Sequence, residues 1–368
     1  MSPPTPDPPG PTQTASSGPP REPAPGEGAP ERGQLLAGPE HFQVEEVPIF
    51  DRSGSGEYLY LQVEKRGLTS ERVAGWIARA LGRSRRDVGY AGRKDRHAVA
   101  RQWFSVRGGR EARVARLETL AEPGSLRVLR VDRDRERLRP GDLAGNRFAL
   151  GLGGVRDPEA LEAALASLDR TGIPNRFGQQ RFGAGGSTLA RARAWGAGEA
   201  ASGDRRTRSL VASAAQAAIF NGVLEGRRRE GRLRVLEVGD LVRVAAGSLV
   251  ACSAENRAAL QAQAAALGAS ATGPLPGSRV RRPGRSVEAR EREWSRTTGI
   301  EWSWLEEGGP LESPGDRRAL VIGFREPPSL EVARDRVWLR FALPPGAYAT
   351  EVLRSLGVSV PARRAEPG

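Results

Sequence analysis

The spacing of hydrophobic and polar residues predicts a strand followed by a helix early in the chain. In residues 57–65, EYLYLQVEK, the two kinds of residue alternate, which is typical of a half-buried strand. Residues 69–82 instead place their hydrophobic side chains at helical spacing. Thr69 stands where a helix cap is favoured, and Gly82 where a helix commonly ends. We therefore expect a strand and a helix directly before the segment 88–106.

The segment 88–106, VGYAGRKDRHAVARQWFSV, is predicted to form two strands joined by a short connection. Hydrophobic residues flank GRKDRH, residues 92–97, on both sides. Gly89 and Gly92 permit a tight backbone there. Asp95 would then stand on a loop between two strands, where a rigid frame can point it into a cleft.

The rest of the chain alternates between strand and helix patterns, and the character of the sequence changes near residue 201, after which helical patterns predominate. Asp157 and Pro158 mark the start of one helix, since Asp is a favoured cap and Pro fits the first turn. We expect strands at 124–132, 145–152 and 319–324, helices at 157–172, 208–231, 253–267 and 286–297, and a strand, turn and helix at 336–356.

Composition supports a folded protein with a proline-rich N-terminal tail. The chain has 368 residues, of which 38% are hydrophobic and 27% charged, enough for a packed core and about two domains. Residues 1–33 contain 11 of the 28 prolines. Such a segment cannot bury enough apolar surface to offset its ordering entropy. We expect residues 1–34 to be disordered.

The charge balance favours a polyanionic partner. The chain carries 57 Lys plus Arg against 44 Asp plus Glu, a net charge of +13, and cationic surfaces gain affinity by releasing counterions from phosphates. A GC-rich genome also favours arginine, so part of the excess reflects codon usage. One cysteine and two histidines argue against a disulfide framework or a structural zinc site. The sequence shows neither a membrane helix nor the apolar core of a signal peptide, so we expect a cytoplasmic protein.

Asp95 is the strongest candidate for chemistry. The chain has only two lysines, Lys65 and Lys94, and the second directly precedes Asp95. A carboxylate among cations is favoured in its ionised form and can act as a nucleophile, a base or a metal ligand. A metal role is unattractive because the only other acid close to it is Asp87, directly before the segment. The alternative is a surface aspartate paired with neighbouring arginines.

A second candidate element is GIPNRFGQQRFG, residues 172–183. Asn and Gln can read a base edge, Arg can bind phosphate, and Phe can stack on a base. The alternative for each phenylalanine is core packing, which we favour for Phe182. Asparagine is rare in this composition, so its few positions are candidates for specific hydrogen bonds. The four asparagines are Asn146, Asn175, Asn221 and Asn256.

Six segments together make the chain resemble the TruD family of tRNA pseudouridine synthases over nearly everything after residue 35. In the family's order they are PEHFQVEE, GYAGRKDRHAVARQW, LAGNRFAL, GIPNRFGQQRFGAGGS, SAAQAAIFN and FALPPGAYATEVLR. The resemblance implies an isomerase that acts on uridine 13, in the D arm of tRNA, and needs no metal and no cofactor.

By this resemblance Asp95 is the catalytic aspartate, and Asn175 and Phe177 form the active-site pair of an NxF motif. Asp95 would either attack the ribose anomeric carbon or abstract the neighbouring sugar proton. The target base must flip out, which costs a few kcal/mol that stacking on Phe177 would offset. Lys94 would be a compact charge near a phosphate or Asp95, the alternative being an ordinary exposed lysine. The expected substrate-binding residues are Lys94, Arg96, His97, Asn175, Phe177, Gln180 and Arg181.

The resemblance also implies an α+β fold, in which helices flank a mixed, largely antiparallel sheet. This catalytic domain would comprise residues 35–200 and 323–368, with a mostly helical TRUD domain inserted at 201–322, a cleft between them, and a monomeric protein overall. Leu36 stands where the family usually has a lysine in the cleft, and His41 replaces an aspartate. That departure supports one alternative, a catalytically silent tRNA-binding protein or RNA chaperone on the same fold. A metal-dependent nuclease is a more distant alternative.

Overall fold

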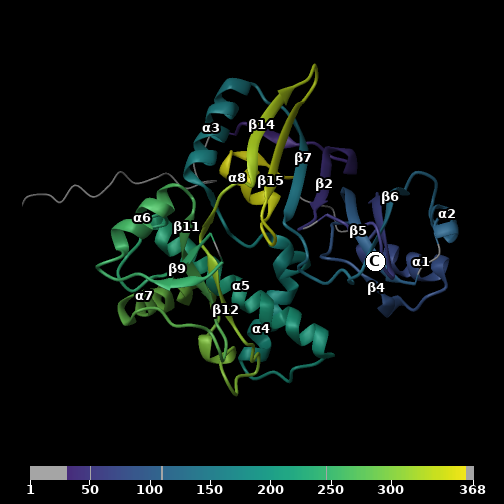
Figure 1. The fold of residues 1–368 in the computed structure, drawn as a ribbon. Coiled ribbons are helices and arrows are strands. Elements are labelled where there is room, and N and C mark those ends of the chain that lie inside the picture. The colour runs from purple at the N-terminus through teal and green to yellow at the C-terminus, as the bar shows by residue number, and fades with distance from the viewer. Residues whose placement is uncertain (1–30, 50, 109–110, 246, 362–368) are drawn as a thin grey trace, which may run out of the picture.

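Two main β-sheets organise the protein, as the computed structural model in Figure 1 shows; it describes residues 31–49, 51–108, 111–245 and 247–361. Within those ranges the larger sheet has 10 strands and the smaller has 4, and a third sheet has only 2. The α+β fold with a mixed, largely antiparallel sheet is confirmed. Most of the predicted tail, residues 1–30, lies outside the described residues.

The larger sheet is the body on which the Asp95 loop is built. Its β2–β5 and β1–β16 pairs are parallel, and its other pairs are antiparallel. Strands from both ends of the chain therefore complete one sheet. The main path runs β14 (Glu326–Val332), β15 (Val337–Leu343), β7 (Gly145–Gly153), β2 (Phe42–Val47), β5 (Val99–Arg107), β3 (Tyr58–Lys65), β6 (Leu126–Asp134), with β1 (Gly33–Leu35), β4 (Val88–Gly89) and β16 (Val358–Ser359) paired beside it.

The first described strand begins within the predicted tail. Gly33 and Gln34, assigned to the tail from the sequence, belong to β1, which pairs with both β16 and β7. Arg32 N also donates a hydrogen bond to Gly357 O at 2.9 Å. A three-residue strand has no periodicity of its own, so only its partners define it.

Helices cover one face of the large sheet. Helix α1 packs against β3 and β5, and its ends follow the sequence prediction: the Thr69 side chain accepts a hydrogen bond from Arg72 N, and Gly82 has a φ of 64°. Helices α3 and α8 cover the part of this face formed by β7 and β15. The helices of this part are α1 (Ser70–Leu81), α2 (Ala115–Glu118), α3 (Pro158–Thr171) and α8 (Ala349–Ser355).

Residues 201–322, the range predicted to be an insertion and here called the inserted region, contain a four-stranded antiparallel sheet that the sequence did not predict. Its strands are β10 (Leu249–Ala251), β9 (Leu241–Val244), β11 (Ala269–Leu275) and β12 (Asp316–Ala319), in that order. Strand β11, ASATGPL, is buried along nearly its whole length, so its sequence does not alternate. Helices were expected here and are present, close to the predicted ranges, as α5 (Arg205–Arg229), α6 (Arg257–Ala265) and α7 (Arg285–Ser295). Before this range lies α4 (Ser187–Gly196), which was not predicted.

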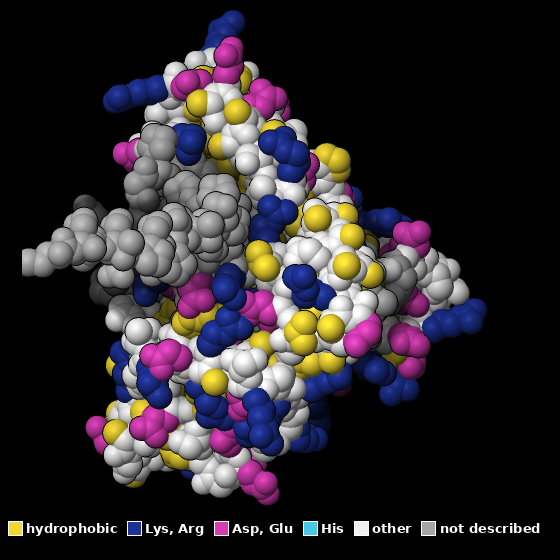
Figure 2. All heavy atoms as spheres, turned by 90° about the vertical axis from the view of Figure 1, so that its left-hand side faces the viewer, with side chains coloured by type: hydrophobic (Ala, Val, Ile, Leu, Met, Phe, Trp, Pro, Cys, Tyr) yellow, Lys and Arg dark blue, Asp and Glu magenta, His cyan; other side chains and the backbone are white. Residues whose placement is uncertain are grey.

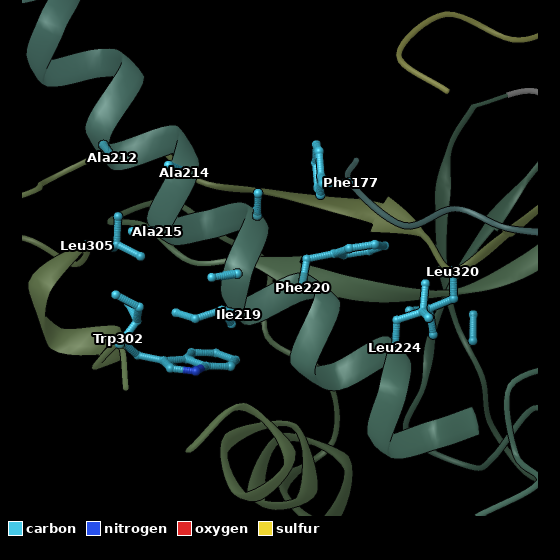
Figure 3. Close-up of a cluster of buried hydrophobic side chains, with 14 of the residues drawn as sticks. Phe177, Ala212, Ala214, Ala215, Ile219, Phe220, Leu224, Trp302, Leu305 and Leu320 are labelled. Atoms are coloured by element: carbon cyan, nitrogen blue, oxygen red, sulfur yellow. The ribbon is translucent and has the colours of Figure 1, made fainter. Parts of the chain in front are cut away.

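Helix α5 is the main support of the inserted region. Its alanine-rich face lies in a buried hydrophobic cluster with Trp302 and Leu305, as Figure 3 shows. The inserted region is also tied to the segment around Asn175, because β13 (Val321–Ile322) pairs with β8 (Ile173–Pro174). The segment carrying Asn175 therefore follows directly from a strand shared by both parts.

Charges of both signs share the face seen in Figure 2, on the side of α6 and α7, where arginines and acidic side chains are interspersed. Several form ion pairs, including Arg282 with Glu288 at 2.7 Å and Arg290 with Glu237. Much of the arginine excess on this side is thus neutralised locally. In the described part of the chain, no helix is both long and apolar enough to cross a membrane.

Candidate active site

The Asp95 loop, residues 90–98, connects β4 to β5 as the sequence predicts. The Asp95 side chain is partly exposed, and its Oδ1 accepts a hydrogen bond from His97 N at 2.9 Å. Arg96 and His97 are exposed, and Arg96 Nε donates to His97 Nε2 at 3.0 Å. The loop therefore presents Asp95, Arg96 and His97 together at the surface.

Lys65, which the sequence did not assign to the site, anchors this loop from the interior. Its side chain is fully buried at the end of β3. Its Nζ donates to three backbone carbonyl oxygens, those of Leu68 at 2.6 Å, Asp95 at 3.1 Å and Lys94 at 3.4 Å. Burial lowers the pKa of Lys65 to about 8, while the Asp95 charge raises it. The sequence offered one signal for Lys65, the rarity of lysine, because Lys65 and Lys94 are the only two lysines of the chain.

Lys94 is buried in an ion pair. Its Nζ donates to Glu46 Oε2 on β2 at 2.7 Å, and the two side chains are 6% and 1% exposed. Burial raises the pKa of Glu46, and the Lys94 charge opposes this. The alternative of an ordinary exposed lysine is therefore wrong, and the ammonium group pairs with Glu46, whereas a position near a phosphate or Asp95 was expected. The pair ties the residue before Asp95 to a central strand.

Polar side chains of α1 and β5 complete the support of the loop backbone. Lys94 N donates to Ser70 Oγ at 3.0 Å, and Ser70 Oγ donates to Gln102 Oε1 at 2.7 Å. Gln102 Nε2 in turn donates to Gly92 O. Because Ser70 and Gln102 are buried, these bonds satisfy polar groups that water does not reach. The main chain is thus bonded both before and at Asp95.

Arg93 connects the loop to helix α5. Arg93 Nε lies 2.5 Å from Glu71 Oε1 on α1, and Arg206 Nη2, in the first turn of α5, lies 3.8 Å from the same oxygen. All three side chains are at least one-third exposed, so each ion pair contributes little to stability. These two ion pairs show where the inserted region lies close to the Asp95 loop.

Asn175 and Phe177 form the second group, and both are buried, at 7% and 6% exposure. Asn175 Nδ2 donates to Ala319 O at 2.9 Å. Phe177 N donates to Asn221 Oδ1 at 2.9 Å, and Asn221 Nδ2 donates to Phe177 O at 3.0 Å. Asn256 behaves in the same way, accepting from Ser253 N at 2.8 Å and donating to Ala251 O at 3.0 Å. Three of the four asparagines therefore make specific hydrogen bonds to the protein's own backbone.

The Phe177 ring packs edge-on against Phe220 of α5, with ring centroids 5.4 Å apart, and Figure 3 shows the two side chains together. It also packs edge-on against Tyr348, with ring centroids 6.1 Å apart. The Arg318 guanidinium lies 4.3 Å from the centroid of the same ring. Phe182, at 8% exposure, is also buried in this cluster. Both phenylalanines thus have the placement of core residues, and Arg318 is a neighbour that the sequence did not reveal.

Arg318 lies on β12 and is held by carbonyl groups. Its Nε donates to Asn175 O at 3.1 Å, and its Nη2 donates to Gly346 O at 3.0 Å and to Asn175 Oδ1. Burial lowers the pKa of Arg318 to about 10; the charge of nearby Arg181 acts in the same direction. Arg181 also lies near the Phe177 ring, 5.5 Å from its centroid.

The remaining candidates occupy separate positions. Gln180 is exposed on a short 3-10 helix, Gln179–Phe182. Asn146 lies opposite Glu46 in the β2–β7 pair, and its Oδ1 is buried with no hydrogen-bond partner among the described residues. Leu36 N donates to Gly151 O near the other end of β7. In the described part of the chain, no group of three or more His, Cys, Asp or Glu side chains is placed to hold a metal ion.

Helix α5 joins the two groups of candidate residues. Arg206 reaches the Asp95 loop through Glu71, whereas Asn221 holds Phe177. At a rise of 1.5 Å per residue, positions 206 and 221 are about 22 Å apart along the helix axis. The Asp95 loop and the Phe177 segment are therefore linked to two well-separated positions of the same long helix.

Comparisons with known proteins agree with this architecture. The family model of tRNA pseudouridine synthase D (TruD) matches residues 27–190 and 197–356. A tRNA pseudouridine synthase D of Anaeromyxobacter dehalogenans is 40% identical over 331 residues, covering 88% of this chain and 92% of that protein. The one from Photobacterium profundum is 36% identical over 327 residues, covering 88% and 91%.

A crystal structure of a TruD protein from Methanosarcina mazei superposes with a TM-score of 0.70 at 22% identity, covering 90% of this chain and 95% of that one. This likeness establishes the fold. The fold and the sequence matches together define an isomerase of the pseudouridine synthase class. The chain belongs to the tRNA pseudouridine synthase D (TruD) family.

Proposed function

We propose that this protein converts uridine 13, in the D arm of tRNA, to pseudouridine, with Asp95 as the catalytic residue and without a metal or cofactor. The observation that carries the proposal is the anchoring of the Asp95 backbone. Buried Lys65 binds the carbonyl oxygens of Lys94 and Asp95, and the Lys94 side chain is locked to Glu46. A partly exposed carboxylate on such a fixed base is suited to a reaction that depends on its exact position.

Asp95 has two chemical routes in this proposal. The carboxylate attacks the anomeric carbon of the ribose, or it abstracts the neighbouring sugar proton; both start from the ionised group. The uracil then leaves the ribose, rotates and rejoins through a ring carbon. Because the base must be flipped out, exposed Arg96, His97 and Gln180 are proposed to contact the displaced nucleotide or its backbone.

We further propose that residues 35–200 and 323–368 form the catalytic domain, that 201–322 form the insertion, and that RNA enters a cleft between them. The pairing of β15 with β7 supports the discontinuous arrangement. The Arg206–Glu71–Arg93 contact supports an approach of the insertion to the Asp95 loop. The protein is proposed to act as a monomer in the cytoplasm, which sedimentation and cell fractionation test.

The decisive experiment maps pseudouridine, nucleotide by nucleotide, in tRNA from cells with and without this protein. Complementation uses the wild type, Asp95→Asn and, as a matched control, Asp335→Asn. The Asp335 side chain is 66% exposed and forms an ion pair with its neighbour Arg336. We expect the modification at position 13 with the wild type and the control, and none with Asp95→Asn. Modification at another position overturns the assignment of uridine 13.

Purified protein separates the remaining alternatives. Turnover of prefolded tRNA in excess EDTA is expected to equal turnover without it. Activity that disappears with EDTA and returns with magnesium contradicts the metal-free proposal. Tight tRNA binding with no pseudouridine formed by the wild type favours the silent RNA-binding protein.

A further inference from the structure

Two half-buried arginines at the Phe177 ring lack the carboxylate partners that the fully buried Arg227 and Arg317 have. Arg227 is paired with Asp240 at 2.7 Å, and Arg317 with Glu291 at 3.1 Å, and all four side chains are 1% exposed or less. Arg318, the next residue on β12, donates only to carbonyl oxygens. Among the described residues no carboxylate lies within ion-pair distance of it. A sheltered guanidinium normally has an acid beside it.

Arg181 adds a second positive charge at the same place. Its guanidinium lies 5.5 Å from the Phe177 ring centroid, and that of Arg318 lies 4.3 Å from it. No carboxylate of the described residues pairs with Arg181 either, and its Nε is buried without a hydrogen-bond partner among them. Like charges held close together repel, and burial strengthens the repulsion. The pair is therefore an arrangement that an incoming anion would stabilise.

The surroundings specify the chemistry of that anion. The Phe177 ring forms an apolar floor, and Asn175 Oδ1 accepts a hydrogen bond from Arg318 Nη2 and so orients the planar guanidinium. The bonds of Nε and Nη2 to Asn175 and Gly346 leave Nη1 of Arg318 to donate to an anion, and the fixed guanidinium plane sets the direction of that contact. Asn175 therefore fixes the orientation of Arg318.

We propose that Arg181 and Arg318, over Phe177, form a subsite for one phosphodiester of the RNA substrate. The choice of RNA as the source of the phosphate rests on the proposed function. In this arrangement Asn175 and Phe177 are positioning residues for the anion site. They hold Arg318 in the plane in which it binds the phosphate.

The first test measures tRNA affinity as a function of salt for Arg181→Gln, Arg318→Gln and the control Arg147→Gln. Arg147 follows Asn146 on β7, so its side chain points to the opposite sheet face, where it pairs with Glu326 at 2.7 Å. All three variants lose one positive charge. We expect the slope of log K against log salt to fall by about 0.7–0.9 in the two subsite variants, the value for one phosphate contact, and by less in the control. Equal slopes in all three overturn the proposal.

Folding of each variant is checked by thermal unfolding. Arg318→Gln removes hydrogen bonds to Asn175 and Gly346, so it has a structural effect of its own. Arg181→Gln carries the test if Arg318→Gln fails to fold, because it removes a guanidinium whose Nε has no partner among the described residues.

A second test locates the phosphate. D-arm linkages of the substrate RNA are replaced singly with uncharged methylphosphonate, and binding to the wild type and Arg181→Gln is compared. At one linkage we expect the wild type to lose affinity about 10-fold and Arg181→Gln to lose almost none. The reason is that the variant already lacks the arginine that would contact the phosphate at that linkage. Additive losses at every linkage overturn the proposal.

Titration with inorganic phosphate distinguishes the two sources of the anion. If Arg181→Gln abolishes phosphate binding but leaves the salt dependence of tRNA binding unchanged, the site binds the free ion and the RNA assignment is rejected. Because these assays measure binding only, their outcome is separate from pseudouridine formation. A wild-type protein that binds RNA through this subsite but forms no pseudouridine rejects the proposed function and leaves the subsite standing.

Discussion

Replacing Lys94 with methionine tests whether the buried Lys94–Glu46 pair supports the Asp95 loop. At 2.7 Å and an effective dielectric constant of about 20, the attraction between the two charges is about 6 kcal/mol. Part of it offsets the cost of burying Lys94 itself, which the substitution also removes. Removing one partner of a buried pair typically costs about 3–5 kcal/mol. We expect a loss of this size in the free energy of unfolding at pH 8, measured by urea denaturation.

The loss in Lys94→Met should depend on pH in a defined direction. Burial raises the pKa of Glu46 above its value in the unfolded chain, and Lys94 opposes the rise, so the variant's Glu46 pKa is higher still. Such a carboxyl stabilises the folded state when protonated, and this contribution is lost as pH rises through its folded pKa. The deficit relative to the wild type should therefore shrink between pH 8 and pH 5. The double variant Lys94→Met with Glu46→Gln should recover part of the loss.

Turnover and RNA binding complete the test. Because Lys94 faces Glu46, the variant should lose turnover through displacement of Asp95 while its affinity for tRNA keeps the wild-type salt dependence. The opposite pattern refutes the reasoning: unchanged stability, with a salt slope lowered by about 0.7–0.9, would show that Lys94 contacts a phosphate.

Three further predictions concern single features of the fold. Burial lowers the pKa of Lys65 from 10.5 to about 8 in the folded protein, so the free energy of unfolding of the wild type should rise by about 3 kcal/mol relative to Lys65→Met between pH 7.5 and 10.5. A difference between the two proteins that stays constant with pH in urea titrations contradicts the buried ammonium. Phe177→Ala should lower the free energy of unfolding by about 3–5 kcal/mol, whereas lost turnover at unchanged stability restores the base-stacking role. Deleting residues 1–35 should lower the melting temperature below that of a protein lacking only 1–30, because it removes β1; equal melting temperatures show that β1 contributes nothing.

Local signals in the sequence predicted the elements whose structure is decided locally. Thr69 and Gly82 bound α1 as expected, since a side-chain cap and a left-handed glycine act within a few residues. The turn between β4 and β5 also follows from glycines and flanking hydrophobic residues. The Asp95 loop was therefore placed correctly before any three-dimensional contact was known.

The support of the site depends on contacts that no local pattern records. Lys94 meets Glu46 only because β2 and β5 are adjacent and parallel, and Arg318 meets Asn175 only because β13 pairs with β8. The small sheet was missed for a related reason, since β11 is buried and does not alternate. The rarity of lysine was the one useful signal for these supporting contacts, and it indicated Lys65 as much as Lys94.

The order in which the ribosome makes these strands exposes the large sheet for part of synthesis. Strand β7 pairs with β2 and, on its other edge, with β15, and the whole inserted region separates β7 from β15 along the chain. Roughly 180 residues must be added in between, which takes on the order of 10–40 s at 5–20 residues per second. During that interval the second edge of β7 is an open strand edge, a known site of aggregation. Expression yield should therefore respond to translation speed and chaperone supply more strongly than the stability of the finished protein suggests.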